Sequence, residues 1–163
     1  MKQADILCGI DSDSSGFITL KTTKTQTRIW FMGDGIVRIR TSFSGHFPEQ
    51  SLSLVWTAWE DHYDQLLGTE RHRTVPLVPT VDDRDNNQLI LTCDDLVVAV
   101  QRAPFSISCG RRDCAASFRD VCGRAYTYSR GHITHSFCLD DSNFYGFGEK
   151  TGDFLSIFNV KPL

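Results

Sequence analysis

The sequence has no apolar run approaching the roughly 20 residues that a membrane-spanning helix requires. Its first eight residues include an acid and lack the apolar centre of a secretion signal, so we expect a cytoplasmic protein. Basic residues are not in excess, since 17 lysines and arginines stand against 20 aspartates and glutamates, a formal net charge of −3. We therefore expect neither a membrane nor a nucleic acid as partner, because nucleic-acid binding normally needs a basic surface.

Catalytic motifs are also missing. The chain has no Gly-x-Ser-x-Gly elbow, and Gly146-Phe147-Gly148 lacks the third glycine and the following helix of a dinucleotide site. Adjacent aspartates occur in three pairs, at 82–83, 94–95 and 140–141. Neighbouring residues of a strand point to opposite faces, and aspartate is common in turns, so we expect all three pairs in turns. The sequence predicts no catalytic residue and no cofactor.

Metal ligands do not group at the usual spacings. His132 and His135 are three residues apart in an expected strand and therefore lie on opposite faces. Cys109 and Cys114 have no second close pair to complete a zinc site. Six cysteines would allow three disulfides in a secreted protein, but without an export signal we expect reduced thiols. We predict no metal site.

Alternation of apolar and polar residues recurs through most of the chain and predicts short strands. Glycine-rich or acidic turns separate several of them, namely 33–35, 94–95 and 110–113. The expected strands are 17–22, 27–32, 36–40, 88–93, 96–101, 105–109, 117–121, 125–128 and 133–138. This pattern predicts an all-β, antiparallel β-sandwich in a single domain.

One segment departs from the pattern. Trp59, Tyr63, Leu66 and Leu67 recur at helical spacing before Gly68, so we expect at most one or two short helices near residues 59–68. Three tryptophans, at 30, 56 and 59, fit a sugar-stacking platform. For Trp30, which alternates with apolar residues in an expected strand, we favour sandwich packing or an outer cover, and for Trp56 and Trp59 we favour core packing.

The segment Tyr145-Gly146-Phe147-Gly148-Glu149-Lys150-Thr151-Gly152 resembles the Tyr-Gly-x-Gly-Glu signature of glycoside hydrolase family 31, the family of α-glucosidases and α-xylosidases. The segments 35–40, 103–107 and 118–123 resemble strands of the same family's N-terminal domain. The resemblance spans residues 15 to 152 and implies a galactose-mutarotase-like β-sandwich over residues 1–153. Residues 154–163 form an atypical, apolar tail where family members continue with polar and basic residues.

The resemblance implies the N-terminal domain of a retaining α-glycosidase. The family's two catalytic aspartates belong to a (β/α)8 barrel that this sequence lacks, so we expect the chain alone to be inactive. The implied partners are that barrel and an α-linked oligosaccharide. By resemblance, Gly148, Glu149, Lys150, Thr151 and Gly152 form a loop near the substrate or the barrel. The alternative is a free-standing carbohydrate-binding or protein-interaction module, and an exposed face or the tail gives a possible homo-oligomer.

Overall fold

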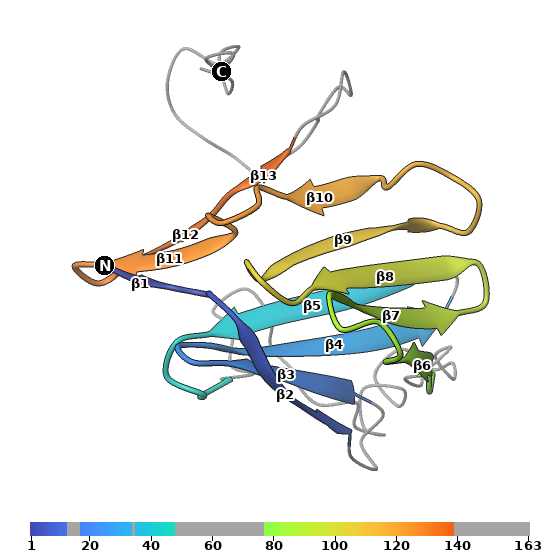
Figure 1. Cartoon of the computed structure of the whole chain (residues 1–163), viewed down its shortest axis with the longest axis horizontal. Helices are drawn as coiled ribbons and strands as arrows, with labels where there is room; N and C mark the ends of the chain where they lie inside the picture. Colours follow the sequence, from blue (N-terminus) through green and yellow to red (C-terminus); the bar gives the residue numbers. More distant parts are fainter. Residues whose placement is uncertain (13–16, 34, 48–76, 139–163) are drawn as a thin grey trace, which may run out of the picture.

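The computed structural model of this protein describes residues 1–12, 17–33, 35–47 and 77–138. These residues form thirteen β-strands and no helix, and every strand pairing among them is antiparallel. The all-β prediction is thereby confirmed, and two main sheets face each other as a sandwich (Figure 1). Within the described ranges, no helix has the length and apolar character needed to cross a membrane.

The first main sheet has four strands in chain order. It contains β2 (Leu7–Ser12), β3 (Phe17–Thr22), β4 (Gln26–Gly33) and β5 (Ile36–Ser42).

The second main sheet has six strands, in the order β13-β10-β9-β8-β7-β6. Its members are β6 (Thr80–Asp82), β7 (Gln88–Cys93), β8 (Leu96–Gln101), β9 (Ser106–Arg111), β10 (Phe118–Asp120) and β13 (Phe137–Cys138).

A smaller third sheet lies at one end of the sandwich (Figure 1). It has the order β1-β11-β12, with β1 (Lys2–Gln3), β11 (Tyr126–Ser129) and β12 (His132–His135).

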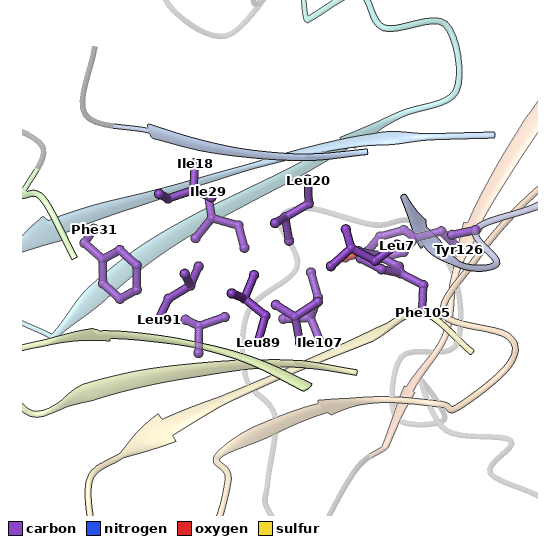
Figure 2. Close-up of a cluster of buried hydrophobic side chains, with 14 residues drawn as sticks. Leu7, Ile18, Leu20, Ile29, Phe31, Leu89, Leu91, Phe105, Ile107 and Tyr126 are labelled. Carbon is purple, nitrogen blue, oxygen red and sulfur yellow. The ribbon is translucent and has the colours of Figure 1, made fainter. Parts of the chain in front are cut away.

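The core lies between the facing sides of the two main sheets. Alternate residues of each strand point inward, which is why the period-2 pattern in the sequence marks them. Figure 2 shows these buried side chains meeting between the sheets. The four-stranded sheet contributes Ile18, Leu20, Ile29 and Phe31, and the six-stranded sheet contributes Leu89, Leu91, Val98, Val100 and Ile107.

The N-terminal segment connects all three sheets. The amide of Ala4 donates to the carbonyl of Tyr126 in the third sheet, at 3.0 Å. The amide of Leu7 donates to the carbonyl of Arg102, at 2.9 Å, and the amide of Phe105 donates to the carbonyl of Asp5, at 2.5 Å. Because β1 and β2 belong to different sheets, residues 4–7 cross from one to the other while bonded to the β8–β9 connection.

Eight of the nine expected strands are found near their predicted places, and the β7–β8 hairpin matches to the residue, with Asp94 in the turn at φ 50°. The single strand expected over 133–138 is wrong, because Ser136 interrupts it. The amide of Ser136 donates to the carbonyl of Ala125, and its carbonyl accepts from Val121. The two halves therefore become β12 and β13, which lie in different sheets.

Two predicted turns also need correction. Asp82 ends β6 instead of lying in a turn, because it pairs with Ile90 of β7. Gly110 and Arg111 extend β9 by pairing with Val97 and Leu96. The sequence also missed β1, β2 and β6 as strands. The helix expected at 59–68 lies outside the described residues.

Candidate functional site

The loop predicted from the family signature lies outside the described residues. This applies to Gly148, Glu149, Lys150, Thr151 and Gly152, and equally to the acid pair 140–141, to Trp56 and Trp59, and to the tail at 154–163. The last described element before the signature is β13, at the edge of the six-stranded sheet beside β10. The surroundings of β13 are therefore the described structure that stands nearest in sequence to the predicted loop.

A buried carboxylate joins two sheets just before β13. The side chain of Asp120, at the end of β10, is fully buried. Its Oδ2 accepts a hydrogen bond from the backbone N–H of Ile107 at 2.8 Å. Its Oδ1 lies 2.7 Å from Nε2 of His135 in β12, which donates to the carboxylate. Because a buried carboxylate is costly unless bonded, this pair ties the six-stranded sheet to the third sheet.

Aromatic rings pack against the His135 side of this pair, whose imidazole remains about one third exposed. The imidazole of His135 stacks on Tyr126 with centroids 4.3 Å apart and planes 10° apart. Phe118 and Phe137 lie 5.7 Å and 5.4 Å from the same imidazole. Burial raises the pKa of Tyr126 above its usual range, and the nearby charge of Asp120 acts in the same direction.

An aspartate–histidine pair also occurs in nucleophilic catalysis, where the histidine bonds a hydroxyl or thiol. No such bond from His135 to a serine, threonine or cysteine is found in the described part of the chain. The pair therefore positions β12 and β13. His132 does not take part in this contact. Among the described residues there is no group of three or more potential metal ligands.

A second feature is a groove of about 520 Å³ between the end of β5, with its following turn, and the third sheet. We call it the cationic groove. Lys2 and Tyr128 line it from the third sheet, and Arg40, Ser42, Phe43 and His46 line it from β5 and the turn. The ring of Tyr128 lies 5.7 Å from that of Phe43, and the Lys2 ammonium lies 5.9 Å from the Tyr128 centroid.

A further hollow of about 420 Å³ opens at a set of strand turns. Ile36 and Phe31 line it from the four-stranded sheet, and Asp94, Asp95 and Arg111 line it from the other sheet. Asp94 and Asp95 sit in the β7–β8 turn as predicted, and the guanidinium of Arg112 donates to the carbonyl of Asp94 at 3.2 Å.

Trp30 forms part of an outer cover of the four-stranded sheet, one of the two packing roles expected for it. It lies on the outer face of β4 and is only 9% exposed. Its ring is 5.1 Å from Phe17, and the Arg38 guanidinium is 5.2 Å from its centroid. With its ring packed in this way, Trp30 offers no open stacking face. All six cysteines are free.

Neither the Asp120–His135 pair nor the cationic groove could be predicted from the sequence. Asp120 and His135 are fifteen residues apart and meet only after β10, β11 and β12 have paired. The polar residues at 42, 44 and 46 form a turn signal around Gly45, which has φ 75°. Such a signal predicts the turn and not the partner that faces it.

Comparison with known proteins supports the fold. No family model and no curated protein matches the sequence. Among solved structures, a GH31 dextranase from Flavobacterium johnsoniae, in complex with glucose, aligns with a TM-score of 0.71 and 15% identity over 94% of this chain. A mutant of that dextranase in complex with isomaltotriose gives the same values. An uncharacterised protein from Listeria monocytogenes, in complex with glucose, magnesium and calcium, aligns with a TM-score of 0.49, 14% identity and 75% coverage of this chain.

The alignment covers only part of each relative. This chain spans 17% of the length of the dextranase and 10% of the length of the Listeria protein. At this level of identity the likeness establishes the fold. The chain therefore has the fold of a region of a GH31 dextranase, consistent with an N-terminal domain of the family that its sequence resembles.

Proposed function

We propose that this chain is the non-catalytic N-terminal domain of a retaining, α-glucosidase-like glycosidase of family 31. In this role it packs on a (β/α)8 barrel and helps shape the site that holds an α-linked oligosaccharide. Gly148, Glu149, Lys150, Thr151 and Gly152 form the loop nearest the substrate or the barrel interface. The catalytic acid and nucleophile belong to the barrel, since glycoside hydrolysis of this kind normally needs two carboxyl groups a few ångströms apart.

One observation carries this proposal. The fold aligns with the dextranase over 94% of this chain, and the signature stretch 145–152 follows in sequence β13, the last strand that the structure describes. The Asp120–His135 pair fits the same role. It joins β12 to β10, and β10 pairs with β13, the last described strand before the signature.

The size of the natural polypeptide tests the proposal. An antibody raised against residues 1–153 should detect, in cells of the source organism, either a protein several times larger than 18.4 kDa or a complex containing a barrel subunit. Immunoprecipitates should hydrolyse aryl α-glucosides, whereas the purified 163-residue chain should not exceed a heat-killed control. A native protein of 18.4 kDa with no co-purifying glycosidase would contradict the proposal.

The second candidate is a free-standing carbohydrate-binding module. The cationic groove favours it, because the groove combines aromatic rings, hydroxyls and a volume of about 520 Å³, within the size range of small-ligand sites. A glycan screen with the isolated chain discriminates the two functions. Saturable binding together with a native size of 18.4 kDa favours the module.

A further inference from the structure

The third sheet ends at β12, and no strand lies on the outer side of β12 in the described part of the chain. All four residues of β12 are exposed, and the exposed fraction of Ile133 is 59%. Proteins usually protect such an edge from pairing with another chain by making it very short, charged or bulged, or by placing proline in it. β12 reads His-Ile-Thr-His and pairs with β11 without a register shift, so it has neither a proline nor a bulge and no acid, lysine or arginine.

The other sheet edges among the described residues are protected. β1 and β13 have two residues each, and β6 has three, of which Asp82 is an acid. β2 carries Asp11, which pairs with Lys21, and its register shifts between Leu7 and Gly9. β5 has two arginines among its seven residues. Within the described structure, β12 is therefore the edge best suited to accept another strand.

The hairpin of β11 and β12 determines where the backbone groups of β12 point. The turn residues 130–131 both have positive φ, 50° and 85°, as a two-residue type I′ turn requires. Such a turn is closed by a hydrogen-bonded pair, here Ser129 with His132. Bonded and non-bonded pairs alternate along antiparallel strands, so Ile133 forms a non-bonded pair with Tyr128. The N–H and C=O of Ile133 therefore point away from β11, toward the open edge.

A hydrogen bond at the other end of the hairpin agrees with this alternation. The amide of Ser136 donates to the carbonyl of Ala125 at 2.9 Å, which makes these two residues a bonded pair. Two residues back on each strand, Thr134 and Thr127 form the next bonded pair. Ile133 again falls in a non-bonded position, so both ends of the hairpin assign its N–H and C=O to the open edge.

A second copy of β12 fits this edge around a two-fold axis. Residues directly opposite each other in an antiparallel pair lie on the same face of the sheet, so a symmetric pairing is centred on one residue. With the axis at Ile133, each Ile133 faces its counterpart, and His132 faces the partner's Thr134. Each Ile133 then donates its N–H to the other's C=O and accepts in return, which satisfies both groups. The same pairing covers two exposed aliphatic side chains and places no histidine opposite a histidine.

We propose that two copies of this chain associate through β12, with Ile133 on the two-fold axis, and so form one continuous sheet with three strands from each copy. This interface goes beyond the proposed function, because it needs neither the barrel nor the signature loop. One pair of short strands buries less surface than a stable dimer needs, so the association is weak, with a dissociation constant on the order of 0.1 mM.

Sedimentation equilibrium of the full chain from about 5 µM to about 500 µM tests the association. The average mass should rise from the 18.4 kDa of the monomer toward twice that value. Amide hydrogen exchange gives an independent measurement on the unaltered chain. Over the same range, exchange of the Ile133 amide should slow about threefold, while the amides of the four-stranded sheet should keep their rates.

Two matched variants locate the interface. Ile133→Lys and Ile36→Lys each replace an isoleucine of an edge strand, 59% and 57% exposed, by lysine. Ile133→Lys should weaken the association at least about tenfold, because two ammonium groups would meet at the axis. Ile36→Lys should leave it unchanged, and equal melting temperatures should show that both variants fold. Phe158→Lys, which places the same charge in the apolar tail, should also leave it unchanged.

Three outcomes overturn the proposal. The first is a chain that remains a monomer over the whole range, with no change in the exchange of the Ile133 amide. The second is an association that Ile36→Lys weakens as much as Ile133→Lys does. The third is an association that Phe158→Lys abolishes and Ile133→Lys does not, which would assign it to the tail.

Discussion

The two main sheets share one core but differ on their outer faces. Outside the four-stranded sheet, the guanidinium of Arg28 lies between the rings of Phe17 and Phe47, at 4.7 Å and 4.3 Å. Outside the six-stranded sheet, a hollow of about 300 Å³ is lined mostly by uncharged side chains such as Gln101, Ser106 and Ser108, with Arg119 and Asp120 as its charged members. The two inner faces are therefore alike, because both carry the apolar side chains of the shared core. The outer faces differ in the side chains that they carry.

The largest expected effect tests the shared core. Leu20→Ala in the four-stranded sheet and Leu91→Ala in the six-stranded sheet should each lower the free energy of unfolding by about 3–4 kcal/mol, because both side chains are fully buried. Urea denaturation followed by circular dichroism measures both. If one substitution cost less than about 1 kcal/mol, the two sheets would not share a single core.

The next effect concerns the pair that attaches the third sheet. Asp120→Ala should cost about 3 kcal/mol, because the N–H of Ile107 and the imidazole of His135 lose their buried acceptor. Asp82→Ala is the matched control, since that carboxylate is partly exposed and its ion pair within the described structure is with Arg84, and the melting temperature of this variant should not change. Equal melting temperatures for the two variants would show that the buried pair adds nothing.

The outer faces are compared by two substitutions to methionine. Arg28→Met keeps the aliphatic stem but removes the cation between two rings, and should cost about 1 kcal/mol. Gln101→Met on the other sheet should change the stability by less than about 0.5 kcal/mol. The Nε of Arg28 is buried without a hydrogen-bond partner. Should Arg28→Met stabilise the protein instead, the stacking would not offset the cost of burying that nitrogen.

The thiols of the two sheets should differ in the rate at which they are alkylated. Burial raises the pKa of Cys93 and of Cys109 in the six-stranded sheet, with the charges of Asp94 and Asp120 adding to it, whereas Cys8 in the four-stranded sheet is exposed. Under native conditions, iodoacetamide should modify Cys8 about tenfold faster than Cys109, because the thiolate is the reactive form. Peptide mass spectrometry over a time course gives both rates. In denaturant all six thiols should react, and equal native rates would contradict the burial of Cys109.

The smallest expected effect concerns the carboxylate of Asp5, on the segment that crosses between the sheets. The hydroxyl of Thr23 bonds this carboxylate and lowers its pKa, with the amides of Ile6 and Thr23 assisting. A lowered folded-state pKa stabilises the protein above the unfolded value near 3.8, and that stability is lost as the pH falls through the folded value. Solvent screening keeps the effect below about 0.5 kcal/mol.

Thr23→Val tests this contribution, because it removes the hydroxyl while keeping the shape of the side chain. Unfolding curves for the variant and the wild type should differ at pH 5 and converge toward pH 2. A difference that stays constant over this range would assign the effect to packing instead of to the carboxylate.

The local alternation of apolar and polar residues was sufficient to predict most strands. Alternation over 88–93 and 96–101, with two aspartates between, predicts the β7–β8 hairpin because pairing partner and turn are adjacent in sequence. In β2, Gly9 interrupts the apolar pattern and the register shifts between Leu7 and Gly9, so the strand lacks a clear local signal. The split at Ser136 was not predictable for a related reason: its hydrogen bonds go to Ala125 and Val121, which only the tertiary fold brings near. The Asp120–His135 pair and the cationic groove are likewise made by distant segments.

The hydrogen bonds of residues 4–7 determine when this segment can take its place in the fold during protein synthesis. These residues leave the ribosome before the residues that they bond, Arg102, Phe105 and Tyr126. Their places exist only after the β8–β9 connection and β11 have been made, 95 to 122 residues later in the chain. This segment is therefore translated well before it can settle, and until then the inner face that it covers is open to chaperones or to neighbouring nascent chains.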